Sequence, residues 1–161
     1  MDKPISIIMG SRSDLGIVKG AMDLLKEFKV GFEVKVLSAH RSPGELAKYV
    51  EDAVKKGTKI FIAAAGGAAA LSGVIAAHTR LPVIGIPIET KSLKGIDSLL
   101  STVQMPAGVP VGCMSIGKPG AKNSAIFALE ILGINDKKIG AKLGAYKNKM
   151  RIKIKNTKID L

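Results

Sequence analysis

Cysteine, histidine and long apolar runs are all scarce in this chain of 161 residues. The single cysteine, Cys113, excludes an internal disulfide; because it lies in an apolar run, we expect it to be a buried core residue. No apolar run approaches the roughly 18 residues that cross a bilayer. The opening residues 1–4 lead directly into a predicted strand, which leaves no room for a signal peptide. These features predict a cytoplasmic protein that does not enter a membrane.

Several ligand-binding motifs are also missing. The chain has neither a Gly-x-Gly-x-x-Gly fingerprint nor a Walker A loop, which argues against dinucleotides and nucleoside triphosphates. It has no cluster of Cys, His and carboxylate residues with metal-ligand spacing, so no metal is predicted. What the chain does have is 47% apolar residues, enough to exclude disorder and to form one well-buried core.

The net charge of +12 is unevenly distributed. Residues 133–161 hold nine Lys or Arg against two Asp and so carry +7 of the total, which leaves the rest of the chain mildly basic. This tail has one aromatic residue, Tyr146, and no recognisable nucleic-acid motif. The composition therefore favours a solvated extension, or an arm that docks on another subunit, over a nucleic-acid-binding arm.

The rest of the chain alternates short apolar runs with helical patterns. Strands are predicted at residues 5–9, 32–37, 59–65, 82–88 and 109–116, and helices at 14–28, 45–56, 71–79, 95–103 and 121–132. Helices between successive strands imply a parallel sheet with right-handed crossovers. We expect a three-layer flavodoxin-like (Rossmann-like) α/β fold with strand order 2-1-3-4-5. Residues 1–132 would form one catalytic domain, and residues 133–161 a basic, partly helical C-terminal extension that packs on a neighbouring subunit.

This strand order brings three loops rich in functional groups to one crevice, because ligands bind where the strand order reverses. The loops are residues 10–14 after the first strand, 38–43 after the second and 65–73 after the third. The second loop places His40, one of only two histidines, beside Arg41. An imidazole can shuttle protons near neutral pH, and a guanidinium can hold a phosphate.

Each of these groups also has an ordinary structural explanation. Ser13 or Asp14 could simply cap the first helix, and the Gly66-Gly67 pair could serve tight packing rather than ligand approach. Arg41 could form a surface salt bridge, and His40 could be a hydrogen-bonded turn residue. We interpret His78, which lies inside a helical pattern, as structural.

The combined motifs resemble the purine-biosynthetic 5-(carboxyamino)imidazole ribonucleotide mutase family. The matching blocks are Gly10-Ser11-Arg12-Ser13-Asp14, Ser38-Ala39-His40-Arg41-Ser42-Pro43, Ala65-Gly66-Gly67-Ala68-Ala69, residues 97–101, residues 103–110 and Gly120-Ala121-Lys122-Asn123. The resemblance covers roughly residues 4–132, with the basic tail outside it. It implies an isomerase of de novo purine (IMP) biosynthesis that moves a carboxylate from the exocyclic nitrogen of its ribonucleotide substrate to carbon 4 of the imidazole. No cofactor is implied. The family forms homo-octamers, and the resemblance implies the same here.

The resemblance also implies roles for individual residues. His40 would be the general acid and base. Ser38 and Arg41 would hold the phosphate with Ser13 nearby, and Asp14 would accept hydrogen bonds from the ribose. The implied substrate-binding residues are Ser11, Ser13, Asp14, Ser38, Ala39, Arg41, Ala65, Gly66 and Gly67, of which Ser11 and the backbone of 65–67 would surround the migrating carboxylate.

One position departs from the family pattern, and two alternatives stand beside the mutase. Many members have histidine where this chain has Ala70, and we expect that histidine to tune the site rather than to be essential.

The related direct carboxylase, which uses CO₂, typically has lysine at the position of Arg41 and Arg-Ser-Asn at residues 67–69, so both differences favour the mutase. A non-catalytic sensor of a phosphorylated metabolite could share the same fold.

Overall fold

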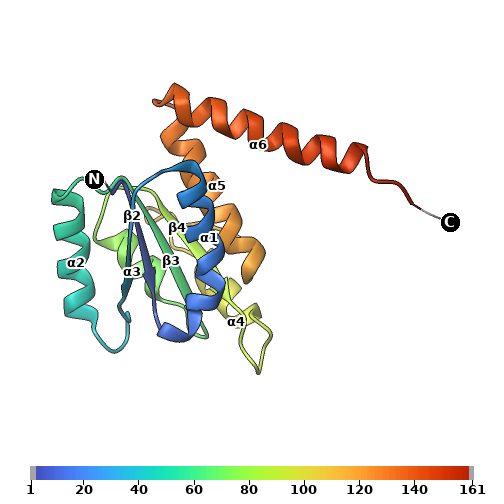
Figure 1. The fold of residues 1–161 in the computed structure, drawn as a ribbon. Helices are drawn as coiled ribbons and strands as arrows, with labels where there is room; N and C mark the ends of the chain where they lie inside the picture. Colours follow the sequence, from blue (N-terminus) through green and yellow to red (C-terminus); the bar gives the residue numbers. More distant parts are fainter. Residues whose placement is uncertain (1–2, 160–161) are drawn as a thin grey trace. The chain divides into compact units, whose positions relative to one another are not determined.

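A parallel sheet of five strands lies at the centre of the computed structural model, which describes residues 3–159. The strands are β1 (Ile5–Met9), β2 (Phe32–Val36), β3 (Ile60–Gly66), β4 (Val83–Ile88) and β5 (Gly112–Cys113). Their order is β2-β1-β3-β4-β5, as predicted, and every pairing is parallel (Figure 1). The chain divides into two compact units, residues 1–125 and 126–161, and the sheet belongs to the first.

Helices begin and end where local chemistry favours it. They are α1 (Leu15–Phe28), α2 (Pro43–Lys55), α3 (Leu71–Ala77), α4 (Ile96–Val103), α5 (Lys118–Gly133) and α6 (Lys137–Lys155), with a 3₁₀ turn, η1 (Arg12–Asp14), before α1. Pro43 occupies the first position of α2, where its missing N–H costs nothing. Lys29 ends α1 in a left-handed conformation, with φ of 59°, and its N–H returns to the last turn. The predicted alternation of strands and helices is confirmed.

Helices cover both faces of the sheet. On one face α2 and α3 bury Leu46, Val50 and Ile75 against Ile8 and Phe61 of the strands (Figure 1). On the other face lie α1 and the beginning of α5, which approach each other at Gly20 and Lys122. Because β1, β3 and β4 are buried on both faces, their sequences are nearly continuous apolar runs.

The fifth strand is much shorter than the predicted residues 109–116. Pro110 has no N–H to donate to the sheet, and neither has Pro87 of β4, whose carbonyl faces the β5 side. The edge continues as single hydrogen bonds, from Met114 N to Gly85 O (2.9 Å) and from Gly117 N to Pro87 O (2.9 Å). Cys113 is only partly buried at this edge, so the expectation that it is a buried core residue was wrong.

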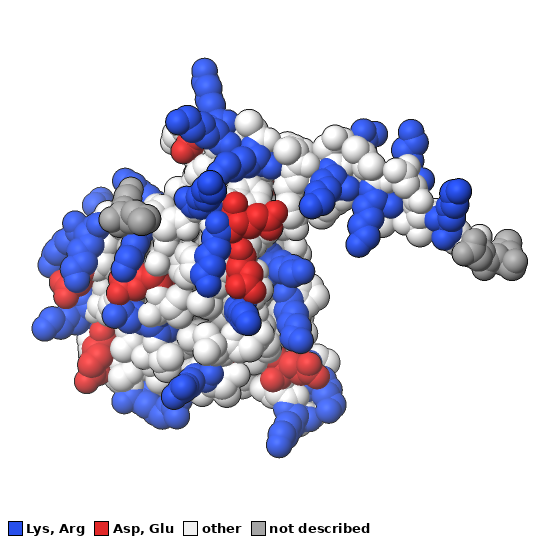
Figure 2. Space-filling view, viewed as in Figure 1, with Lys and Arg blue, Asp and Glu red and all other residues white. Residues whose placement is uncertain are grey.

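The second unit contains the end of α5 and the whole of α6. The carboxylate of Asp136 accepts hydrogen bonds from Lys138 N (2.8 Å) and Ile139 N (3.2 Å) and so caps α6. Lys147 forms an ion pair with Glu130 (2.6 Å). Lys and Arg side chains project along the length of α6 (Figure 2). Among residues 3–159, we find no helix with both the length and the apolar character that spanning a membrane requires.

Candidate active site

A cavity of about 360 Å³ opens at the carboxyl ends of β1, β2 and β3, where the strand order predicted a crevice. Three loops form its wall. The lining residues are Gly10, Ser11, Asp14, Ser38, Ala39, His40, Arg41, Ala65, Gly66, Ala68, Ala69, Ala70 and Leu71. Of the predicted site residues, eight line the cavity directly. Ser13 and Gly67 do not line it: Ser13 bonds to the lining residues Ser11 and Asp14, and Gly67 bonds to Ser98 of α4.

The first loop brings a nearly buried carboxylate to the cavity. Ser11 caps η1 by accepting a hydrogen bond from Ser13 N (3.3 Å). The hydroxyl of Ser13 lies 2.9 Å from Ser11 Oγ and 3.1 Å from Asp14 Oδ1. Asp14 is only 8% exposed and makes no side-chain cap of α1. Burial raises the pKa of Asp14, although hydrogen bonds from Ser13 and Ser11 oppose the shift. Asp14 is therefore available to accept hydrogen bonds from ligand hydroxyls.

The second loop is held together by short hydrogen bonds among its own residues. Ser38 N donates to Ser42 Oγ (3.0 Å), and Ser42 Oγ donates back to Ser38 O (3.1 Å). Arg41 N donates to Ser38 Oγ (3.2 Å), which turns the chain into α2. His40 lies between these anchors, exposed on the cavity wall. The loop therefore presents an imidazole on a backbone that its neighbours fix.

Arg41 joins the second loop to the first. Its Nη2 donates to the carbonyl of Gly10 at 3.0 Å, and its Nε lies 3.4 Å from Ser38 Oγ. Within residues 3–159 we find no ion pair of Arg41, so the structure does not support the alternative explanation of Arg41 as a surface salt-bridge residue. The guanidinium charge therefore faces a cavity in which an anion could bind.

The third loop contributes an apolar wall of small residues. Ala68, Ala69, Ala70 and Leu71 line the cavity, although the sequence analysis gave the first two and Leu71 no functional role. Gly67 has a left-handed φ of +67° and donates its N–H to Ser98 Oγ of α4 (3.0 Å). The sequence analysis placed this loop at the crevice by its position after the third strand, but it gave Ala68, Ala69 and Leu71 no part in the wall. The wall supplies shape rather than hydrogen bonds.

Two further features lie outside this cavity. His78 caps the far end of α3 and lines a separate open hollow with Glu51, Lys55 and Arg80, so it takes no part in the candidate site. In the described part of the chain, no group of three or more His, Cys, Asp or Glu residues could hold a metal ion.

The architecture and the motifs at its edge match one known family. The family model described as AIR carboxylase matches residues 4–153. This chain belongs to the AIR carboxylase family. The match continues through most of α6, so the expectation that the basic tail lies outside the resemblance was wrong.

Curated relatives within the AIR carboxylase family are close in sequence. The N5-carboxyaminoimidazole ribonucleotide mutase of Vibrio parahaemolyticus is 52% identical over 144 residues, which are 89% of each chain. The protein of the same name from Pyrococcus abyssi is 52% identical over 147 residues, 91% of this chain and 83% of that one. The crystal structure of Treponema denticola PurE has a TM-score of 0.85 at 26% identity, with 93% of this chain and 92% of that chain covered.

Proposed function

We propose that this AIR carboxylase family protein is an isomerase, the mutase that converts N5-carboxyaminoimidazole ribonucleotide to 5-amino-4-carboxyimidazole ribonucleotide in purine biosynthesis. The observation that carries the proposal is the cavity itself, with His40, Arg41 and Asp14 on its wall, in a chain 52% identical to proteins named as that mutase.

The reaction needs one proton to be given and one to be taken. As the bond between the exocyclic nitrogen and the carboxylate breaks, His40 donates a proton to the nitrogen, and CO₂ is released inside the cavity. The electron-rich carbon 4 then attacks the CO₂ to form the new carbon–carbon bond. His40, now neutral, removes the proton from carbon 4 and restores the aromatic ring. The histidine ends as it began, and the two ribonucleotides differ only in the position of the carboxylate.

The proposed substrate-binding roles come from the family resemblance, and the positions of the polar groups support them. Arg41 and Ser38 bind the phosphate, with Ser13 nearby, and the Arg41 guanidinium has a planar donor set suited to phosphate oxygens. Asp14 accepts hydrogen bonds from the ribose hydroxyls, a role supported by its near burial beside the cavity. The remaining proposed contacts, around the migrating carboxylate, come from Ser11, Ala39, Ala65, Gly66 and Gly67. Gly67 acts through the loop, since its own atoms do not line the cavity.

Confinement of CO₂ is the main catalytic demand in this scheme. Released CO₂ must meet carbon 4 before it diffuses away, so holding the two together gives a proximity advantage. The apolar wall of residues 68–71 supports this role because its side chains, three alanines and a leucine, place apolar groups rather than hydrogen-bonding groups beside the released CO₂. Ala70 belongs to this wall, which agrees with a tuning role for the histidine that many family members have there.

We also propose that the protein is a cytoplasmic homo-oligomer, with an octamer as the specific expectation, and that residues 133–161 contact a neighbouring subunit. Ile96, Leu100 and Val103 lie on one side of α4 and are 57%, 51% and 49% exposed, which is typical of a contact surface. Light scattering of the full chain and of a chain ending at residue 132 tests both statements. A monomeric full chain would refute the oligomer, and an unchanged assembly after truncation would refute the role of the tail.

Binding to nucleic acid is not proposed; it would require a strongly salt-dependent affinity that truncation removes.

The deciding experiment supplies freshly prepared N5-carboxyaminoimidazole ribonucleotide, the carbamate substrate, without bicarbonate. It measures the rate at which the product carboxylated at carbon 4 is formed. We expect turnover by the wild type and a loss of about 10²–10⁴-fold in His40→Asn. His78→Asn is the matched control, because it removes the other histidine from outside the cavity. Turnover that requires added CO₂ and free aminoimidazole ribonucleotide would identify the direct carboxylase instead. Binding without turnover under either condition would identify a sensor.

A further inference from the structure

The apolar wall of the cavity is supported by a helix that the cavity does not touch. Ser98 of α4 is completely buried, and its Oγ accepts a hydrogen bond from Gly67 N (3.0 Å). The same hydroxyl donates to Ile88 O at the end of β4 (2.6 Å). One hydroxyl therefore ties the loop after β3 to the neighbouring strand, with its donor and one acceptor position both used.

The loop beyond Gly67 has few other supports. Ala69 N donates to Gly67 O (2.8 Å) and Ala70 N to Ala68 O (2.6 Å), so each of these two alanines is placed by the residue two positions before it. Ser101 Oγ lies 3.4 Å from Gly67 O, but it donates to Asp97 O at 2.8 Å and has only one proton to give. Ser98 is therefore the better-formed side-chain tie between the loop and α4.

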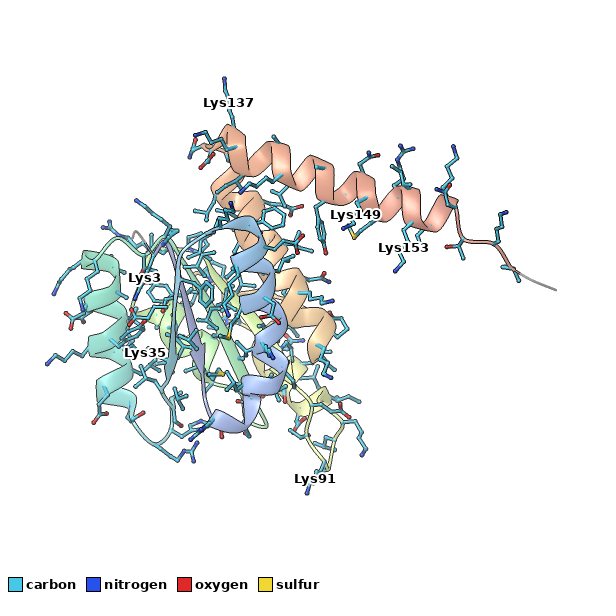
Figure 3. All side chains as sticks on the ribbon, viewed as in Figure 1. Lys3, Lys35, Lys91, Lys137, Lys149 and Lys153 are labelled. Carbon is cyan, nitrogen blue, oxygen red and sulfur yellow. The ribbon has the colours of Figure 1, made fainter. Side chains whose placement is uncertain are left out.

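Helix α4 is well suited to hold this tie in place. Thr90 Oγ1 bonds to the Asp97 carboxylate (3.0 Å) and closes the loop between β4 and α4, in which Figure 3 labels Lys91. Thr102 Oγ1 donates to Ser98 O (2.8 Å) within the helix, and Thr102 packs closely on Gly85 of β4. A displacement of Ser98 would therefore have to move a helix that is packed against the sheet.

We infer that Ser98 is a positioning residue that holds the apolar wall in place beside CO₂ between the two halves of the proposed reaction. This inference rests on the proposed mutase function. Ser98 touches no reacting atom, so its loss should not prevent the carbamate from losing CO₂. It should instead let the wall shift, so that CO₂ escapes before it reaches carbon 4. Misplacement by about 1 Å can cost a factor of about 10² in such reactions.

The test measures how the carbamate substrate partitions between two fates, after correction for its spontaneous decay. One fate is the carbon-4 product, and the other is aminoimidazole ribonucleotide with free CO₂. For Ser98→Ala we expect the ratio of the second to the first to rise at least about tenfold, with kcat for the product lowered more than KM is raised. Excess bicarbonate, a source of CO₂, should restore much of the product.

Ser124→Ala is the matched control. Ser124 is also completely buried, but its hydroxyl donates only within its own helix, to Ala121 O (2.7 Å), so the partition should stay at the wild-type ratio. If Ser98→Ala does not fold, Ser98→Cys replaces it, because the thiol fills the site with a weaker hydrogen-bonding group and should give an intermediate ratio.

The possible results separate the inference from the function beneath it. An unchanged ratio in the Ser98 variant, or an equal change in both serine variants, would overturn the inference while the mutase function stands. Failure of bicarbonate to restore product would also overturn it, since escape of CO₂ would not then be the defect. A wild type that makes no carbon-4 product from the carbamate would refute the proposed function, and the inference with it.

Discussion

Replacing Gly67 by alanine tests whether the loop after β3 is held in its left-handed conformation. Gly67 has φ of +67°, and a Cβ at this position would meet no atom within 4 Å, so the substitution strains the backbone without a steric clash. The left-handed conformation costs an L-residue about 1–2 kcal/mol. Alanine also loses less entropy on folding, which offsets about 0.4–1 kcal/mol. We therefore expect Gly67→Ala to lower the free energy of unfolding by about 1 kcal/mol.

Gly16→Ala is the control for this prediction. Gly16 lies in the first turn of α1, and a Cβ there would also meet nothing within 4 Å, but its φ is not in the left-handed region. Alanine should therefore stabilise the helix by about 0.5–1 kcal/mol. The two variants should differ by roughly 1.5–2 kcal/mol in urea unfolding. They are to be measured at one protein concentration, because subunit assembly would make the midpoint depend on it.

Two outcomes would refute the reasoning about Gly67. If Gly67→Ala is as stable as Gly16→Ala, the loop does not need a left-handed residue at this position. If it loses more than about 3 kcal/mol, an atom must occupy the space that the structure leaves open, since strain alone does not cost so much. Retained activity in a mildly destabilised variant would show that Ser98 still holds the loop.

Three other substitutions probe the site and its support. Because burial raises the pKa of Asp14, the folded protein keeps this proton to a higher pH than the unfolded chain does, and stability falls as pH rises through that interval. Asp14→Asn should therefore be more stable than the wild type in urea at pH 7 and should lose that advantage in acid. Its KM should rise because a ribose contact is weakened. An equal gain in stability at both pH values would contradict this explanation. Ala70→His should change kcat/KM less than about tenfold, since His40 carries both proton steps, and a larger gain would show that it does not. Gly85→Ala, whose Cβ would lie 2.4 Å from Thr102 Cγ2, should cost about 1–3 kcal/mol of unfolding free energy, largely recovered by adding Thr102→Ser; additive costs would contradict the contact.

The layered fold could be predicted because local and global signals agree in this chain. Apolar runs of five to seven residues mark β1, β3 and β4, and helical periodicity separates them, so the parallel order followed from standard connection rules. The prediction failed at β5, where the sequence still looks like a strand. Strand β5 is short because Pro87 of the neighbouring strand has no N–H to donate to it. Such an effect of a partner strand cannot be seen when one segment of the sequence is considered alone.

The polar half of the site could also be predicted from the sequence, because Ser11, Asp14, His40 and Arg41 follow strands whose carboxyl ends meet. The contribution of α4 could not. Ser98 is a buried serine on an amphipathic helix, and nothing in its local pattern shows that its hydroxyl faces a glycine 31 positions earlier. Alanines in the wall were similarly inconspicuous, because their contribution is the space they leave rather than a functional group.

The two halves of the cavity are held by different means, and this difference has a consequence for the proposed reaction. Polar residues of the first two loops bond to one another, as Arg41 does to Gly10 and Ser13 to Ser11, so substitutions there, apart from those of His40, should mainly change how tightly the ribonucleotide binds. The apolar wall has no polar side chains with which to hold itself and is tied to α4 by the buried hydroxyl of Ser98. Substitutions behind that wall should therefore leave substrate affinity nearly intact and change the fate of CO₂. A set of variants across both halves should separate into these two classes, and a wall variant that weakened only binding would show that the division is wrong.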